Sequence, residues 1–175
     1  RSKGRSELYQ DNMQVVVNTV TPIDPSKVTV ADFLAHTTND IDQMFGELKE
    51  AVGSIQNASL KALADAFLAD TLGGLNGVLW LAGMKMHHGY IGGLLEHTHG
   101  MMRVAQAILP LYPHVQRDLV LAGIFLHDMG KTEELSYDMA FSYTDSGRLI
   151  GHISKALVMI HKQADALRSQ GVEIR

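Results

Sequence analysis

Hydrophobic residues in the segment TTNDIDQMFGELKEAVGSI recur every three or four positions, which is the spacing of one face of an amphipathic helix. Asn39 and Asp40 stand near its start and are suitable capping residues. A second helix is predicted directly after it, because four further apolar residues share one face: Leu60, Leu63, Phe67 and Leu68. The chain is therefore predicted to become helical soon after residue 36.

Three more helices are predicted in the second half of the chain. The apolar pattern covers about 94–109, where prolines end it, about 115–128, and 149–167. Gly130 lies just beyond the second of these helices and is predicted to be its C-terminal cap. The segment AFSYTDSG predicts a short hairpin or loop, and the glycine-rich segment 73–93 shows no regular pattern.

One stretch near the N-terminus predicts a β-strand. The segment MQVVVNTVTPI (13–23) is the only strongly β-branched one, and Pro22 and Pro25 indicate a linker. No second strand that would pair with it is predicted. The chain is thus predicted to be all-α, with a short strand and linker at 1–30 and a helical domain at 31–175.

Composition and charge limit the classes of function. The 175 residues are 46% hydrophobic and 19% charged, which provides a substantial core for one domain, or for one domain and a fragment of another. The net charge of -4 argues against a protein that coats nucleic acid through bulk positive charge. It is compatible with an enzyme that has a local nucleic-acid site.

The N-terminal sequence and the length of the apolar runs bear on location. No signal peptide is visible in residues 1–10, and no apolar run reaches about 18 residues, so a cytoplasmic protein without a membrane segment is expected. The first residue is Arg1 rather than methionine, which indicates a fragment or a processed end.

The segment AGIFLHDMGK places a histidine and an aspartate at the end of an apolar run. Burying His127 and Asp128 is costly unless both are paired, and a divalent cation would satisfy both. His97 lies near the start of the preceding helix, and the short turn PLYPHVQ predicts that the two helices pack antiparallel. His97 would then meet His127 and Asp128. On the dipeptide alone, a simpler alternative is favoured, in which His127 caps its helix and Asp128 forms a surface ion pair.

The segments LLEHT and LHDMGK, in this order, resemble the HD-domain superfamily of metal-dependent phosphohydrolases. Three blocks, HHGYIGGLLEHT, AGIFLHDMGKTEEL and YTDSGRLIGHI, together resemble the YhaM-type branch of bacterial 3'-5' exoribonucleases, over about 32–163. The resemblance implies an HD-domain helical bundle. In that branch an oligonucleotide-binding β-barrel precedes the HD domain, so the strand and linker would be the tail of a mostly absent barrel.

The resemblance also implies roles for individual residues. His97, His127 and Asp128 match the family's metal ligands. His152 matches a histidine that helps to hold a second ion, and Lys131 matches a lysine that meets a phosphate oxygen. Asp128 and Lys131 would thus be the catalytic residues.

The resemblance also concerns positions before His97 and after His152. His87 and His88 match a histidine pair at the mouth of the site and would bind substrate together with Lys131. The family also has a later His-His pair and another aspartate. Beyond His152 the chain offers only His161 and Asp165, so the HD domain is predicted to lack its C-terminal part.

The chemistry implied is phosphodiester hydrolysis by metal-activated water, with single-stranded RNA, and possibly single-stranded DNA, as the substrate. Cysteine is absent, so one or two divalent ions would be bound by imidazole and carboxylate. That ligand set favours manganese, with iron, cobalt or magnesium as alternatives. Two other functions stay open: a nucleotide or cyclic-dinucleotide phosphohydrolase on the same centre, and a non-catalytic HD scaffold. The sequence does not predict an oligomeric state.

The remaining histidines are predicted to be structural or solvated. His99 lies two positions from His97, on the far side of its helix, and His114 lies in a turn. His36 lies outside the motif blocks. The methionines are predicted to fill the core.

Overall fold

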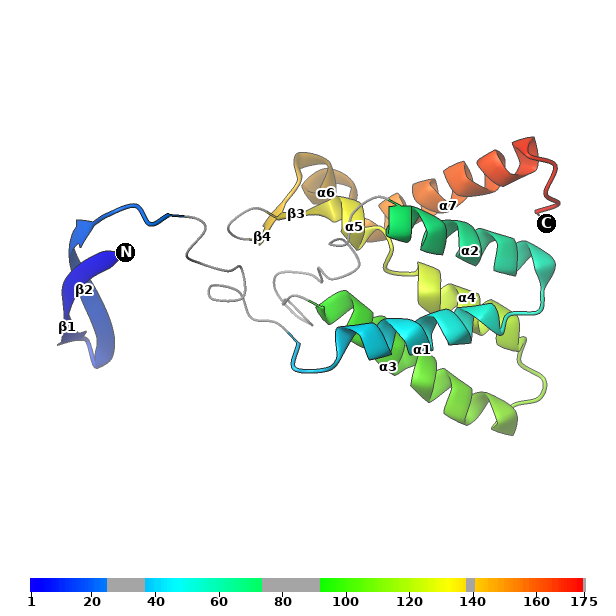
Figure 1. Cartoon of the computed structure of the whole chain (residues 1–175), viewed down its shortest axis with the longest axis horizontal. Helices are drawn as coiled ribbons and strands as arrows, with labels where there is room; N and C mark the ends of the chain where they lie inside the picture. Colours follow the sequence, from blue (N-terminus) through cyan, green and yellow to red (C-terminus); the bar gives the residue numbers. More distant parts are fainter. Residues whose placement is uncertain (25–36, 74–91, 138–140, 175) are drawn as a thin grey trace. The chain divides into compact units, whose positions relative to one another are not determined.

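The computed structural model describes residues 1–24, 37–73, 92–137 and 141–174 of the chain. By their internal contacts the residues form two compact units, Arg1–Phe33 and Leu34–Arg175. Figure 1 labels the helices and strands of both. The predicted site residues His87 and His88, and also His36, lie outside the described residues.

The N-terminal unit contains an antiparallel hairpin of β1 (Ser2–Tyr9) and β2 (Asn12–Val20). Gln10 and Asp11 form the two-residue turn, both with positive φ (48° and 62°), as turns that match the twist of the strands require. The strand predicted at 13–23 is confirmed in β2, but the expectation that it has no partner was wrong. Strand β1 was missed because SKGRSELY is largely polar and lacks the β-branched residues that indicate a strand.

The described residues of the helical unit form five longer helices: α1 (Ile41–Gly53), α2 (Ala58–Gly73), α3 (Gly93–Ile108), α4 (Arg117–Leu126) and α7 (His152–Ser169). They pack around one apolar core, whose fully buried side chains include Leu48, Val52, Ile55, Leu94, Leu95, Met102, Leu121 and Phe125. The mostly helical fold predicted from the sequence is therefore observed, together with two small antiparallel sheets.

Both helices predicted in the first half are confirmed. Asp40 caps α1, because its side chain accepts a hydrogen bond from the Gln43 amide at 3.0 Å. Asn57 serves α2 in the same way, accepting from the Leu60 amide at 3.0 Å. The Asp118 carboxylate of α4 accepts from the amides of Gln56 and Asn57, at 2.8 and 2.7 Å, and so links the α1–α2 connection to α4.

The α3–α4 hairpin also follows the prediction. Helix α3 ends at Ile108 and is followed by a single turn of 3-10 helix (Leu109–Leu111) that contains Pro110, and α4 follows after a short connection. The two helices lie side by side, with the start of α3 near the end of α4 (Figure 1).

The predicted cap at Gly130 is wrong. Helix α4 ends at Leu126, its C-cap is His127 in ordinary right-handed geometry, and Gly130 is not among the described glycines with positive φ. Glycine is needed there for space, because an added Cβ would collide with the His152 carbonyl and the Ala156 amide of α7. The turn after Asp128 is thus pressed directly against the start of α7.

The residues described between α4 and α7 form four short elements: α5 (Lys131–Glu134), β3 (Leu135–Tyr137), β4 (Phe141–Tyr143) and α6 (Asp145–Ile150). Strands β3 and β4 pair antiparallel. Of the hairpin or loop expected at AFSYTDSG (140–147), only β4 lies within that segment, because β3 precedes it and α6 begins at Asp145. The single helix predicted at 149–167 is divided into α6 and α7, because Gly151 adopts φ +74° between them.

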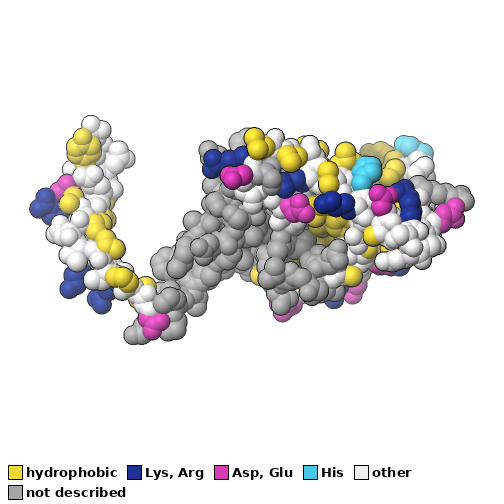
Figure 2. All heavy atoms as spheres, turned by 90° about the horizontal axis from the view of Figure 1, so that it is seen from above, with side chains coloured by type: hydrophobic (Ala, Val, Ile, Leu, Met, Phe, Trp, Pro, Cys, Tyr) yellow, Lys and Arg dark blue, Asp and Glu magenta, His cyan; other side chains and the backbone are white. Residues whose placement is uncertain are grey.

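Hydrophobic side chains reach the surface of α6 and α7, on the side from which Figure 2 views the molecule. They include Leu149, Ile153 and Leu157, whose exposed fractions are 86%, 74% and 56%. No helix in the described part of the chain is long and apolar enough to cross a membrane.

Candidate metal centre

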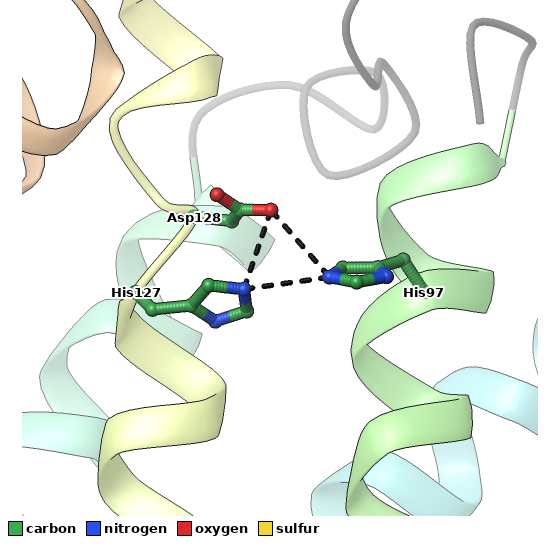
Figure 3. Close-up of side chains that lie close together, drawn as sticks. All are labelled: His97, His127 and Asp128. Carbon is green, nitrogen blue, oxygen red and sulfur yellow. Dashed lines mark hydrogen bonds and ion pairs between the residues drawn. The ribbon is translucent and has the colours of Figure 1, made fainter. Parts of the chain in front are cut away.

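Three side chains from two helix ends meet at one point. His97 comes from the first half of α3, His127 ends α4, and Asp128 follows directly (Figure 3). The Nε2 atoms of the two histidines lie 3.4 Å apart, and they lie 3.6 Å (His97) and 3.3 Å (His127) from Asp128 Oδ2. This is the meeting that an antiparallel α3–α4 hairpin predicts.

The ring of His127 is held in one orientation by its own helix. Its Nδ1 lies 2.8 Å from the carbonyl oxygen of Ile124. A carbonyl can only accept, so Nδ1 carries a proton and Nε2 faces the cluster. Nε2 donates to Asp128 when the ring is protonated, and it offers a lone pair to an ion when the ring is neutral. Fixing a ligand histidine through a backbone carbonyl is usual in metal sites, because it sets both the tautomer and the ring plane. The role of the Ile124 carbonyl was not predicted, because every residue has a backbone carbonyl and the side-chain pattern does not distinguish this one.

Asp128 is the buried centre of the site, with 7% of its surface exposed. Burial alone would raise the pKa of its carboxyl, but hydrogen bonds from His127 and Lys131 and their nearby charges outweigh burial and hold the pKa well below its usual range. The group is therefore a carboxylate at neutral pH. The same hydrogen bond with Asp128 raises the pKa of His127 in the metal-free protein, against the opposing effect of burial.

Two further cationic or basic side chains contact this carboxylate. Lys131 Nζ lies 2.6 Å from Asp128 Oδ2, and His152 Nε2 lies 3.5 Å from the other oxygen, Oδ1. Lys131 stands on α5 and His152 on α7, whose start is pressed against the Gly130 turn. The structure thus brings together five of the seven side chains that the resemblance assigned to the site; His87 and His88 lie outside the described residues.

The geometry of His97, His127 and Asp128 fits a divalent ion. The three donor atoms form a nearly equilateral triangle with edges of 3.3–3.6 Å. A point near its centre is about 2 Å from each atom, which is the usual distance from a transition metal to imidazole nitrogen or carboxylate oxygen. Among the described residues these three are the group whose donor atoms lie close enough to hold one ion.

The other candidate residues have contacts of their own. His99 Nε2 lies 2.7 Å from Glu47 on α1, and His114 stacks edge-on against Tyr112 in the α3–α4 turn. His161 bonds to the Leu157 carbonyl of its own helix, and Asp165 pairs with Arg168. These contacts agree with the prediction that His99 and His114 are structural or surface residues.

Comparison with curated proteins bears on what this centre does. The chain is 32% identical to the 3'-5' exoribonuclease YhaM of Listeria innocua over 172 residues, covering 98% of this chain and 54% of that protein. It is 35% identical to the YhaM protein of Listeria monocytogenes over 147 residues (84% of this chain and 46% of that protein) and 29% identical to that of Bacillus subtilis over 174 residues (95% and 52%). The resemblance to the YhaM-type branch is confirmed.

The chain spans about half the length of the curated relatives it matches. No family model matches the sequence, and no solved structure matches it. The relatives are named as enzymes that degrade RNA from the 3' end, and their similarity covers the whole segment that carries the metal cluster.

Proposed function

We propose that this chain carries the catalytic metal centre of a 3'-5' exoribonuclease that acts on single-stranded RNA. The observation that supports it most directly is the triangle of His97, His127 and Asp128, in a chain whose relatives are named for that activity. The helical unit would be an HD domain, and the β1–β2 hairpin would belong to an oligonucleotide-binding barrel. The proposal includes a cytoplasmic location.

His97, His127 and Asp128 would hold the first divalent ion, through two imidazole nitrogens and one carboxylate oxygen. When bound, such an ion supplies Lewis acidity, which activates water for attack on phosphorus and offsets charge on the phosphoryl oxygens. Mixed nitrogen and oxygen donors favour manganese, and iron, cobalt or magnesium are the alternatives. His152 faces the second oxygen of Asp128 and would contribute to a second ion there.

The chain's own residues supply orientation and charge. Asp128 stays ionised because of its hydrogen bonds, so that it can bind a cation and orient water at neutral pH. Lys131 lies 2.6 Å from the oxygen that would bind the ion, which places its ammonium group where a phosphoryl oxygen of the substrate would come. Charge that grows on this oxygen during reaction would be stabilised by that ammonium group. His87 and His88 would contact the substrate at the mouth of the site.

The proposal is tested by measuring metal content and RNA degradation together. The purified protein, loaded with Mn²⁺ and dialysed, should retain about one or two ions per chain and shorten single-stranded RNA labelled at its 5' end stepwise from the 3' end. His127→Ala should lose most of the metal and of the activity. His161→Ala is the matched control, because His161 lies exposed on α7 and bonds only to its own helix among the contacts described.

Other outcomes favour the alternatives. Hydrolysis of mononucleotides or cyclic dinucleotides, with single-stranded RNA left intact, would indicate a nucleotide phosphohydrolase on the same centre. Retention of metal without turnover of any phosphodiester would indicate a scaffold. Full metal content in His127→Ala would remove that histidine from the ligand set.

A further inference from the structure

A groove of about 770 Å³ lies on the helical unit beside the metal cluster. Its walls come from the start of α1, the outer face of α3 and one side of α4. Its volume lies in the range of sites that bind small molecules or parts of polymers. His97 belongs both to this lining and to the metal cluster, so the groove and the centre are continuous.

The side chains that follow His97 along the groove form one apolar line. On α3 they are Met101, Val104 and Ile108, which with His97 recur at steps of four, three and four residues and so share one helical face. Ile124 and Val120 of α4 form the facing wall. Val104 and Ile108 are 60% and 47% exposed, so this apolar surface is open to a ligand.

The polar residues of the groove do not suit phosphate groups. Among the described lining residues Arg103 is the one lysine or arginine, whereas Asp40, Glu47 and Glu96 are acidic. Hydrogen bonds with His99 and Gln43 lower the pKa of Glu47, which keeps it ionised and repels anions. Carboxylates and the amides of Asn39 and Gln43 do suit the amino and carbonyl edges of nucleobases. An apolar surface with such a rim fits bases that are turned inward, with their phosphates turned to solvent.

We propose that this groove binds the nucleobases of single-stranded RNA on the 5' side of the phosphate at the metal centre. The proposal rests on the proposed function, which brings a strand to His97, and it adds where the uncleaved part of that strand lies. From His97 to Ile108 the helix rises roughly 16 Å, and stacked bases repeat about every 3.4 Å, so the line accommodates about four or five bases. The groove would thus make the enzyme prefer oligonucleotides to dinucleotides.

The preference for length provides the test. Steady-state kinetics with a dinucleotide and with an RNA of about eight nucleotides, long enough to fill the groove, give the ratio of their kcat/KM values. The wild type should favour the longer RNA by about tenfold or more, since packing of several bases is lost in the dinucleotide. In Val104→Glu, which places a charge in the middle of the apolar line, this ratio should fall close to one through a higher KM for the longer RNA. General damage to the metal centre would lower kcat/KM for both substrates by the same factor and leave their ratio unchanged.

Leu157→Glu is the matched control, because Leu157 of α7 is exposed to nearly the same degree (56%) and lies outside the groove. In Leu157→Glu, the ratio of kcat/KM for the longer RNA to kcat/KM for the dinucleotide should equal that of the wild type. An unchanged ratio in Val104→Glu would overturn the proposal. If light scattering also showed that Val104→Glu changes the mass of the protein in solution, this face would instead be assigned to contacts between copies of the chain.

A direct binding measurement separates this proposal from the proposed function. If the wild type hydrolyses neither RNA nor a small diester such as bis(p-nitrophenyl) phosphate, the proposed function fails. Fluorescence anisotropy of a labelled eight-nucleotide RNA with Asp128→Asn still tests the groove. Adding Val104→Glu to Asp128→Asn should weaken binding about tenfold, and equal binding by both proteins would overturn the groove.

Discussion

The Nε2 atoms of His97 and His127 lie 3.4 Å apart, although the two residues are 30 positions apart in the sequence. Their helices are antiparallel, so the early part of α3 meets the end of α4, and both helices bury side chains in the same core. The short distance is therefore a property of the hairpin as a whole. Any ion bound there would tie the two helices together at the end opposite their connection.

Loss of His97 should abolish strong metal binding. His97→Ala removes one of three donors and is expected to lower the affinity for Mn²⁺ by more than about a hundredfold, since even outer residues of metal sites contribute tenfold or more. Titration calorimetry or competition with a fluorescent chelator measures this. His114→Ala, an exposed histidine in the α3–α4 turn, should bind Mn²⁺ like the wild type. Equal affinities for His97→Ala and the wild type would contradict the ligand assignment.

Lys131 should affect the rate more than metal binding. Lys131→Met removes the ammonium group beside Asp128 Oδ2 but none of the three ligand atoms. We expect Mn²⁺ to stay bound and kcat on single-stranded RNA to fall about a hundredfold, the size of effect seen when one group that stabilises transition-state charge is lost. Lys131→Arg should recover part of the rate.

Lys61→Met controls for the loss of a lysine, because Lys61 forms an exposed ion pair with Asp65 on α2. It should leave both kcat and metal content unchanged. If Lys131→Met lost its metal instead, Lys131 would act by holding Asp128 in place rather than by contacting the substrate.

The sequence predicted the site better than it predicted the segments around it. His97, His127 and Asp128 were predictable because their donor atoms are on side chains and a short turn fixes the direction of the two helices. The contribution of the Ile124 carbonyl was not predictable, since every residue has a backbone carbonyl. Strand β1 was missed because its pairing with β2 depends on backbone hydrogen bonds and on the turn at Gln10 and Asp11, with little apolar alternation.

Two glycines account for the other differences between the predicted and the observed structure. Gly151 lies inside the helix predicted at 149–167, and its φ of +74° divides that stretch between α6 and α7. Gly130 looked like a helix cap from its position after His127 and Asp128. Its actual role, to let α7 approach, depends on a tertiary contact that no local pattern encodes.

Asp118 should stabilise the fold in a way that depends on pH. Its carboxylate accepts from two exposed backbone amides, which water can serve in Asp118→Ala, so the substitution should cost about 0.5–1.5 kcal/mol of unfolding free energy at pH 7. Burial raises the pKa of Asp118, but the Asn57 and Gln56 amides and Arg117 outweigh it, so that the folded pKa is lowered. Urea denaturation at several pH values measures the effect.

The sign follows from that lowered pKa. The folded state binds the proton of Asp118 less readily than the unfolded state, so the contribution is fully present above the ordinary carboxyl pKa of about 4 and is lost as the pH falls through the lowered value. The difference between wild type and Asp118→Ala should therefore shrink in acid. Asp42→Ala, at an exposed position in the first turn of α1, should change stability by less than about 0.5 kcal/mol. A difference that stayed constant into acid would show that the charge of Asp118 contributes nothing.

Gly130 should be essential for placing His152, whereas another glycine in the same region should be replaceable. In Gly130→Ala the new Cβ meets the His152 carbonyl and the Ala156 amide, both backbone atoms that cannot turn away, so α7 must shift at a cost of about 1–3 kcal/mol. In Gly123→Ala, on the exposed side of α4, the Cβ meets nothing within 4 Å and should stabilise the helix by about 0.5–1 kcal/mol. Thermal unfolding compares the two, and binding of a second Mn²⁺ should weaken only in Gly130→Ala, because His152 moves with α7. Equal stability of the two variants would mean that α7 does not press on the turn after Asp128.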